Sequence, residues 1–312
     1  MKLLIDAGNH RLKWAVTRAA NRDPNRDTGL DSGLDIGDAV TIDRNSPAEL
    51  EAALTAAWAG LEPAAVWASC VAGPAVEKVI AAVAGRVWNL QPAFIASPAR
   101  QAGVVNSYPQ PARLGGDRWA ALVGARRMFP RRAVIVVDAG SAVTVDALDA
   151  GGVFRGGVIL PGARAMREAL RRQTANLGGP GDDGDGDGDG AGDGAGDGAG
   201  DGAGDGENDC AAPGPAVADV ADATGAAPTV AATVATALAT DTQAAVAGGA
   251  WLALAGGVER AVAAQRAALQ SECTVIVTGG DAGRLAELLS AGAECAPDLV
   301  LRGLAVIAAQ SS

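Results

Sequence analysis

Two segments of this 312-residue chain share one pattern, which restricts the possible folds more than any other feature of the sequence. Residues 3–16 and residues 133–145 each contain an apolar run, then Asp-Ala-Gly and a polar residue, then a second apolar run. Such a pattern predicts a β-hairpin with a tight turn. Two copies predict two related half-domains, each presenting an Asp and a glycine-containing turn to a shared cleft.

The other predicted elements alternate between helices and apolar strands, which indicates an α/β protein with mixed sheets. Ser46-Pro47-Ala48-Glu49 is typical of a helix start, with Ser as the N-cap and Pro at the first helical position. In the first half we expect strands at 40–43, 64–71 and 93–96, helices at 46–59 and 74–85, and an irregular segment at 101–116. In the second half we expect strands at 133–138, 142–148, 156–162 and 274–277, and helices at 117–129, 163–172, 229–270, 283–291 and 303–309.

Length and composition favour a globular, non-membrane protein. The chain is long enough for two compact lobes, and 49% of its residues are hydrophobic. No apolar run reaches the roughly 18–20 residues that a membrane helix needs, and the N-terminal apolar stretch is too short for a signal peptide. The four cysteines share no metal-ligand or disulfide spacing, so we expect reduced thiols and a cytoplasmic protein.

The net charge of -11 arises from one segment. Residues 181–209 hold ten Asp and one Glu without Lys or Arg, so the remainder balances at 25 acidic against 25 basic residues. The charge of the rest therefore gives no support for a nucleic-acid partner. Residues 181–206 are almost entirely Gly, Asp and Ala with no large apolar residue to bury, which predicts disorder. We treat about 179–227 as a surface insert.

Three short motifs could carry chemistry. The turn at 6–9 suits a phosphate or its metal, because Gly8 allows a close backbone approach and Asp6 could hold a hydrated Mg²⁺. A single copy is more often an ordinary hairpin turn, but the second copy at 138–141 favours a binding site. Thr278-Gly279-Gly280 could border a base or ribose, or be a simple strand-to-helix turn. No P-loop motif occurs in the chain.

The hexamer Leu114-Gly115-Gly116-Asp117-Arg118-Trp119 is the more informative motif. Asp117 could accept a hydroxyl proton where a loop enters a helix, and Arg118 could neutralise phosphoryl charge. Taken alone, the hexamer favours a helix-capping Asp beside a surface Arg.

In their order along the chain, these motifs resemble the type III pantothenate kinases, members of the acetate kinase/sugar kinase/Hsp70/actin superfamily. The resemblance spans nearly the whole chain except the insert, and the segment from Tyr108 to Trp119 is its most specific part. The other matching segments are Asp6-x-Gly8-Asn9 with Lys13, Ser69-Cys70-Val71, Asp138-x-Gly140-Ser141, Gly156-Gly157-x-Ile159-x-Pro161-Gly162, Thr174-Ala175-x-Leu177, Thr242 with Gly248, and Thr278-Gly279-Gly280-Asp281.

The resemblance implies two ribonuclease H-like (actin-like ATPase) lobes with mixed sheets. The first would cover 1–112, and the second 113–312, interrupted by the disordered acidic Gly/Asp/Ala insert. It implies a homodimer that phosphorylates pantothenate with ATP, the first step of coenzyme A synthesis, with Mg²⁺ and a monovalent cation, K⁺ or NH₄⁺. Two alternatives remain open: a kinase for another small alcohol such as a sugar, and a nucleotide-binding regulator of the same fold.

The resemblance also implies roles for individual residues. Asp117 would be the general base, Asp138 would bind the monovalent cation, and Asp6 would lie near Mg²⁺, possibly through water. The implied ATP-binding residues are Asp6, Ala7, Gly8, Asn9, His10, Arg11, Leu12, Lys13, Ser141, Gly279 and Gly280. The implied pantothenate-binding residues are Tyr108, Gly115, Gly116, Asp117, Arg118 and Thr242.

One departure from the family pattern lies in the first turn. His10, the only histidine, stands where relatives usually carry Ser or Thr. Its imidazole could donate to a phosphate, or it could point away while backbone amides bind.

Overall fold

The computed structural model describes residues 1–18, 36–174, 238–290 and 292–310. The predicted disorder at 181–206, and the insert at about 179–227 as a whole, lie outside these residues. None of the helices in the described part of the chain is both long and apolar enough to cross a lipid bilayer.

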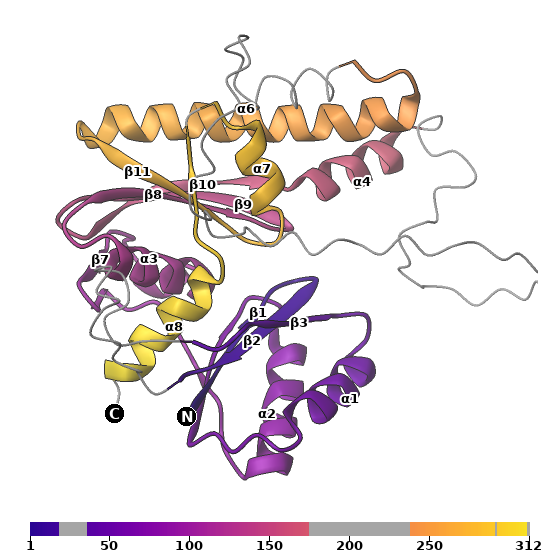
Figure 1. The fold of residues 1–312 in the computed structure, drawn as a ribbon, viewed down its shortest axis with the longest axis vertical. Coiled ribbons are helices and arrows are strands. Elements are labelled where there is room, and N and C mark those ends of the chain that lie inside the picture. Colours follow the sequence, from indigo (N-terminus) through magenta and orange to yellow (C-terminus); the bar gives the residue numbers. More distant parts are fainter. Residues whose placement is uncertain (19–35, 175–237, 291, 311–312) are drawn as a thin grey trace, which may run out of the picture.

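The first lobe contains a five-stranded sheet in the order β3-β2-β1-β4-β5. The predicted hairpin is present, with β1 antiparallel to β2, and β4 runs parallel to β1 on its other side. Two helices, α1 and α2, cover one face of the sheet around a core that includes Leu54, Trp58 and Ile80 (Figure 1). The elements are β1 (Lys2–Ala7), β2 (Arg11–Val16), β3 (Val40–Asp43), α1 (Pro47–Trp58), β4 (Ala65–Cys70), α2 (Pro74–Trp88) and β5 (Ala93–Phe94).

The second lobe contains a seven-stranded sheet in the order β12-β11-β8-β9-β10-β7-β6. Its strands are β6 (Arg100–Gln101), β7 (Val104–Asn106), β8 (Ala133–Ala139), β9 (Ala142–Leu148), β10 (Val153–Pro161), β11 (Cys273–Thr278) and β12 (Glu294–Cys295). Its helices are η1 (Pro111–Arg113), α3 (Gly116–Met128), α4 (Ala163–Gln173), α6 (Thr242–Leu269), α7 (Ala282–Leu288) and α8 (Leu299–Gln310).

The two sheets repeat one topology. In the first sheet, β3, β2 and β1 are antiparallel neighbours, and β4 and β5 continue in parallel. In the second sheet, β10, β9, β8, β11 and β12 follow the same sequence of pairings. Asp6 and Asp138 therefore occupy equivalent positions near the ends of β1 and β8. This repetition confirms the two-lobed α/β fold predicted from the two hairpins.

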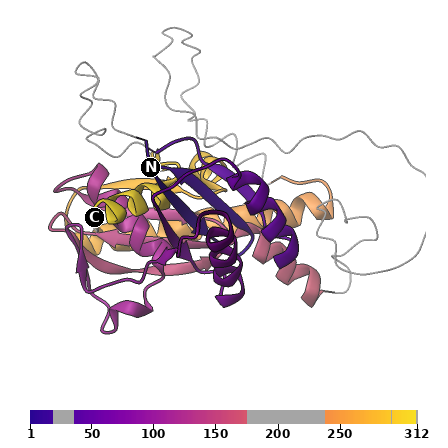
Figure 2. The same ribbon diagram turned by 90° about the horizontal axis from the view of Figure 1, so that it is seen from below.

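The helices form layers on both sides of the sheets. Helices α3 and α8 lie between the two sheets and share a core with Leu4 of β1 and Val136 of β8 (Figure 1). Helices α4, α6 and α7 cover the opposite face of the second sheet, where Leu254, Val258 and Leu285 pack against it. A second view places α4 alongside the first half of α6 (Figure 2).

Several predicted boundaries of helices and strands differ from those in the structure. Helix α2 continues past Gly85 to Trp88, because a left-handed Asn89 with φ of 55° ends it instead. The segment 101–116, expected to be irregular, contains part of β6, all of β7 and the short helix η1. Residues 299–301 belong to α8, which is one continuous helix. Strands β6 and β7 join the second sheet, so we propose that the lobe boundary lies between β5 and β6 rather than at 112/113.

Candidate active site

The two Asp-x-Gly turns meet across the lobes. The first turn lies between β1 and β2, and the second lies between β8 and β9. His10 Nδ1 of the first turn lies 2.5 Å from Ser141 Oγ of the second, although the two residues are 131 positions apart in sequence. The imidazole is thus directed at the opposite turn, inside the predicted nucleotide site.

The aspartates of these turns lie in one electrostatic centre with Asp117. Burial, reinforced by the charges of Asp138 and Asp117, raises the pKa of Asp6 to about 8. Burial and the charges of Asp117 and Asp146 raise the pKa of Asp138 to about 7. Lys13 counteracts both shifts. The structure therefore brings together three predicted acidic residues and one predicted cation from both lobes.

Asp117 lies in the first turn of α3, as the hexamer predicted. Ser97 Oγ donates to the carbonyl oxygens of Leu114 at 2.8 Å and Gly115 at 3.3 Å, which secures the loop before the helix. The Arg118 amide donates to Asp117 Oδ1 over 2.7 Å and orients the carboxylate. A Cβ on Gly115 would lie 2.5 Å from that oxygen, so a larger residue there would displace the Asp117 carboxylate. Burial raises the pKa of Asp117, which makes it a better proton acceptor than an exposed Asp.

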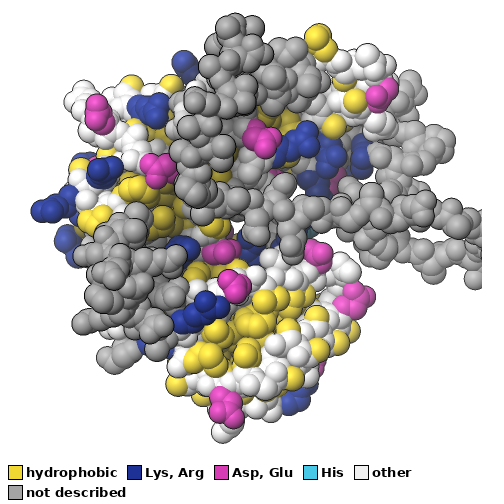
Figure 3. All heavy atoms as spheres, in the orientation of Figure 1, with side chains coloured by type: hydrophobic (Ala, Val, Ile, Leu, Met, Phe, Trp, Pro, Cys, Tyr) yellow, Lys and Arg dark blue, Asp and Glu magenta, His cyan; other side chains and the backbone are white. Residues whose placement is uncertain are grey.

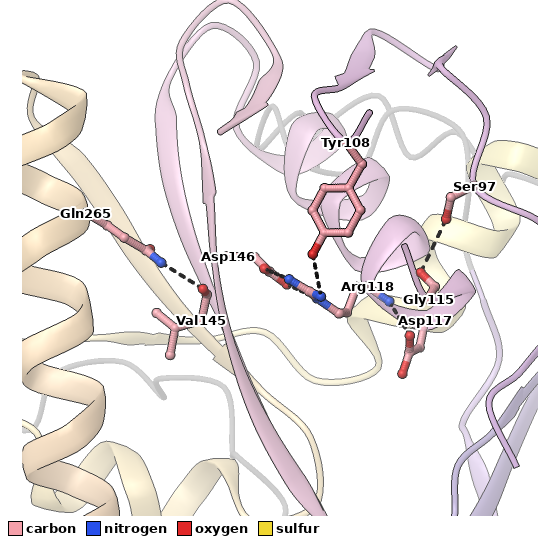
Figure 4. Close-up of polar contacts among 8 residues, drawn as sticks. All are labelled: Ser97, Tyr108, Gly115, Asp117, Arg118, Val145, Asp146 and Gln265. Carbon is pink, nitrogen blue, oxygen red and sulfur yellow. Dashed lines mark hydrogen bonds and ion pairs between the residues drawn. The ribbon is translucent and has the colours of Figure 1, made fainter. Parts of the chain in front are cut away.

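The Arg118 side chain is buried, which corrects the surface position that the hexamer alone favoured. Its Nε donates to Asp146 Oδ2 at 2.9 Å and its Nη2 to Asp146 Oδ1 at 2.5 Å. Its Nη1 donates to the Tyr108 hydroxyl at 3.3 Å (Figure 4). Two predicted substrate residues, Tyr108 and Arg118, are therefore in contact. Sequence reasoning missed Asp146, because it lies 28 positions away within the apolar run of β9.

Sequence reasoning also missed Asp298 and Arg44, which support the first turn. Lys13 Nζ lies 3.5 Å from Asp298 Oδ1, at the start of α8. Arg44 Nη1 donates to the carbonyl oxygens of Gly8 and Asn9, each at 2.5 Å. Neither Asp298 nor Arg44 belongs to a motif. The pairing of β3 with β2 brings Arg44 to the turn, and the packing of α8 brings Asp298 there.

The other predicted residues of the first turn differ in whether their side chain or only their backbone could contact ATP. The side chains of Ala7 and Leu12 are fully buried, so only their backbone could contact ATP. Asn9 is exposed. A Cβ on Gly8 would come within 3.3 Å of the Arg11 carbonyl oxygen. The turn therefore offers backbone and polar side chains, while its apolar members anchor it to the first lobe.

The turn after β11 lies beside this centre. Gly279 has φ of 97°, and a Cβ there would lie 2.2 Å from the Ala139 carbonyl oxygen. A Cβ on Gly280 would lie 3.1 Å from Arg11 Nη1, so this turn approaches the first one. The neighbouring Asp281 is surrounded by three cations, whose charges oppose the effect of burial on its pKa: Arg11, Arg167 and Arg284. Helix α4 carries Arg167 among four arginines, and basic side chains gather over it (Figure 3). The surroundings favour an anionic ligand.

Thr242 is separate from the rest of the predicted substrate site. It is exposed at the start of α6, next to its N-cap Asp241. The first turns of α6 lie beside α4, on the opposite face of the second sheet from α3 (Figure 1). Within one chain, the structure does not bring Thr242 to Tyr108 or Asp117.

Asp6 and Asp138 fit a divalent metal ion that completes its coordination with the phosphates of a nucleotide and with water. Among the described residues, no group of three or more His, Cys, Asp or Glu side chains could enclose a metal by itself. Mg²⁺ commonly uses one or two carboxylates together with phosphates and waters. Asp6 and Asp138 are hard oxygen donors whose pKa values are raised by burial first and by neighbouring carboxylates second, so their ionised forms lack a compensating positive charge. A nucleotide-bound divalent cation would supply that charge.

Comparisons with known proteins show the family of the chain. A family model described as type III pantothenate kinase matches residues 2–180. The type III pantothenate kinase of Paraburkholderia phymatum is 34% identical over 314 residues, which cover 99% of this chain and 94% of that protein. The same-named protein of Herminiimonas arsenicoxydans is 32% identical, with 99% of this chain and 97% of that protein covered.

A solved structure shares the fold. It comes from Campylobacter jejuni and is provisionally described as a Baf family transcriptional activator. The TM-score is 0.50 at 16% identity, with 99% of this chain and 98% of that chain covered. At this identity the likeness concerns the fold alone. The family model and the near full-length relatives carry the assignment: the chain belongs to the type III pantothenate kinase family.

Proposed function

We propose that this protein transfers the γ-phosphoryl group of ATP to the primary hydroxyl of pantothenate, in the first step of coenzyme A synthesis, with Asp117 as the general base. The observation that carries the proposal is the position of Asp117. It is close enough to Asp6 and Asp138 for its charge to raise both of their pKa values, a backbone amide orients its carboxylate, and burial raises its own pKa. Phosphoryl transfer requires positioning and charge neutralisation, with a base for the attacking hydroxyl.

The nucleotide would occupy the cleft between the turns. Residues 6–13 and Ser141 would contact the phosphates, and Gly279 and Gly280 would border the adenosine. Asp6 would hold Mg²⁺, directly or through water, and the metal would neutralise charge on the phosphates. Lys13 and Arg11 would add fixed positive charge at the same place. The contact between His10 and Ser141 supports a site made from both lobes.

Asp138 would bind the monovalent cation, K⁺ or NH₄⁺. Its position is equivalent to that of Asp6, yet it lies in the other lobe, so the two carboxylates can serve different cations. Its raised pKa indicates that a cation would stabilise its ionised form.

Pantothenate would lie against the start of α3, lined by Tyr108, Gly115, Gly116 and Arg118. Arg118 would act on the substrate mainly through Tyr108, because its buried guanidinium donates to Asp146 and to the Tyr108 hydroxyl. Thr242 would complete the site from a second copy of the chain.

We further propose that the enzyme is a homodimer. Val158 and Ile159 of β10 are 42% and 62% exposed, and Leu170 of α4 is 41% exposed. Strand β10 pairs with β7 only at Val153 and Phe154. This exposed apolar stretch of β10, at the edge of the sheet, suits a second copy, and Ile159→Glu should convert the dimer to a monomer in light scattering. A wild-type monomer would contradict the proposal.

A cytoplasmic location is proposed from the cysteines. Cys70 and Cys273 are thiols rather than disulfide partners. Reduced cysteines are typical of the cytoplasm, where ATP is available.

An ADP-release assay tests the reaction. Purified protein with ATP, Mg²⁺ and K⁺ should release ADP only when pantothenate is added. A panel of sugars and other small alcohols distinguishes the alternative kinase, and ATP binding without turnover would indicate a regulator. The absence of pantothenate-dependent release, with either K⁺ or NH₄⁺, would contradict the proposal.

A further inference from the structure

The Arg118 side chain is held in one position by contacts on several sides. Asp146 of β9 accepts two bonds from its guanidinium in a fork-to-fork arrangement. The Tyr108 hydroxyl accepts a third bond. The guanidinium carbon also lies 5.8 Å from the centre of the Phe154 ring, which itself is 5.6 Å from the Tyr108 ring. Arg118 is 7% exposed, so little of it is left to contact a ligand directly.

Asp146 is itself rigidly placed. It is 2% exposed in the middle of β9. The backbone of β10 covers it, because a Cβ on Gly157 would lie 1.9 Å from Asp146 Oδ1. From α6, Gln265 Nε2 donates to the adjacent Val145 carbonyl oxygen at 2.7 Å (Figure 4). Burial raises the pKa of Asp146, while the bonds from Arg118 counteract this shift.

The contacts of Arg118 link this rigid carboxylate to both parts of the substrate site. On one side, the guanidinium bonds to Tyr108. On the other, the backbone amide of the same residue donates to Asp117 Oδ1 at 2.7 Å. Anchoring the side chain of Arg118 therefore also restricts the amide that orients the proposed base.

We infer that Asp146 is a positioning residue for the kinase reaction, acting through Arg118 on Tyr108 and on the orientation of Asp117. The inference rests on the proposed role of Asp117. The hydrogen bonds of Asp146 lead through Arg118 to the pantothenate side of the site, so KM for ATP should depend on it little, although its charge also acts on Asp138. The competing explanation is a buried ion pair that contributes only to folding.

Kinetics with Asp146→Asn separate these explanations. The variant preserves shape but removes the charge and one acceptor. We expect kcat/KM for pantothenate to fall by about 10- to 100-fold, as for other losses of a buried charged partner, with KM for ATP within about twofold of wild type. The matched control is Asp149→Asn, which breaks the Asp149–Arg155 pair at the far end of the same strands and should leave both constants unchanged.

A spectroscopic signal reports the position of Tyr108. It is the only tyrosine of the chain, so labelling with 3-fluorotyrosine gives a single ¹⁹F resonance. The resonance should move in Asp146→Asn and not in Asp149→Asn, and its response to added pantothenate should weaken. Arg118→Lys should reproduce the fall in kcat/KM and the shift of the Tyr108 resonance. The double variant Asp146→Asn/Arg118→Lys should have a kcat/KM no lower than either single variant, because both substitutions break the same Asp146–Arg118 interaction.

The outcomes are distinguishable. If wild-type protein shows no pantothenate-dependent turnover, the proposed function fails. If wild type is active but folded Asp146→Asn matches Asp149→Asn in kinetics and ¹⁹F spectrum, the inference is overturned. If Asp146→Asn does not fold, Arg118→Lys decides: unchanged kcat/KM and an unmoved Tyr108 resonance overturn the inference.

Discussion

At the scale of single residues, neighbours in sequence have different tasks. The carboxylate of Asp117 belongs to the acidic centre with Asp6 and Asp138. The side chain of Arg118 turns away from this centre to Asp146. Adjacent residues on a helix point in different directions, so one turn of α3 can serve both the reaction and the framework that supports it.

Replacing the base should remove the chemistry and leave the fold. Asp117→Asn should lower kcat by about 10²- to 10⁴-fold, the usual contribution of a general base. ADP release measures the rate, and circular dichroism with ATP binding checks the fold. Asp38→Asn, whose side chain is fully exposed, is the control and should behave as wild type. A normal rate in folded Asp117→Asn would exclude Asp117 as the base.

The pH dependence of the rate follows from the same carboxylate. A base must be ionised to accept a proton, so kcat/KM should fall as pH decreases through the pKa of Asp117. Because burial raises that pKa above its ordinary value of 3.8, the acid limb should lie at a higher pH than for an exposed Asp. A pH–rate profile measures this. If the residual activity of Asp117→Asn keeps the same limb, another group is responsible.

At the scale of elements, the active site depends on how closely α3 and α8 approach. A Cβ on Gly303 of α8 would lie 1.8 Å from the Ala120 carbonyl oxygen of α3. A Cβ on Gly124 of α3 would lie 2.7 Å from the Leu299 carbonyl oxygen. The two glycines allow the backbones to pack directly, and this contact sets the position of the helix that presents Asp117.

Gly303→Ala should therefore destabilise the protein by about 1–3 kcal/mol, as overpacking typically does, and should lower kcat by displacing α3. Gly256→Ala in α6 is the matched control, because a Cβ at that position would have no atom within 4 Å. At position 256, Ala has a greater helix propensity than Gly, so the free energy of unfolding should equal or slightly exceed that of wild type. Chemical denaturation of both variants measures the difference. Equal free energies of unfolding for Gly303→Ala and Gly256→Ala would contradict the packing explanation.

At the scale of the whole molecule, two lobes with repeated topology bring the carboxylates of Asp6, Asp117 and Asp138 into one acidic centre. The folded protein should therefore be least stable when no cation is bound there. The folded protein retains a proton on Asp6 up to a pKa of about 8, whereas the unfolded chain releases it near 3.8. Between these values the folded state binds more protons, so stability decreases as pH rises.

Metal-free protein should consequently melt at a lower temperature at pH 8 than at pH 6. Asp6→Asn should reduce this difference, and Mg²⁺ with ATP should stabilise wild type more than the variant. Differential scanning calorimetry with and without EDTA measures both effects. Identical pH dependence in wild type and Asp6→Asn would show that the charge on Asp6 does not limit stability.

Local sequence patterns were sufficient to predict many of the secondary-structure elements and motifs of this protein. The hairpins around Asp6 and Asp138, the N-cap at Ser46 and the placement of Asp117 at a helix start could be predicted, because each depends on residues within a few positions of one another. The order of the motifs was sufficient to predict the family that the near full-length relatives show.

Only the tertiary structure decided the rest, because packing joins residues that no local pattern connects. It paired Arg118 with Asp146, Lys13 with Asp298 and His10 with Ser141. It also placed β6 and β7 in the second sheet and kept Thr242 away from Asp117. The sequence by itself determined which groups could perform the chemistry; the packing of two sheets around α3 and α8 decided which of them meet.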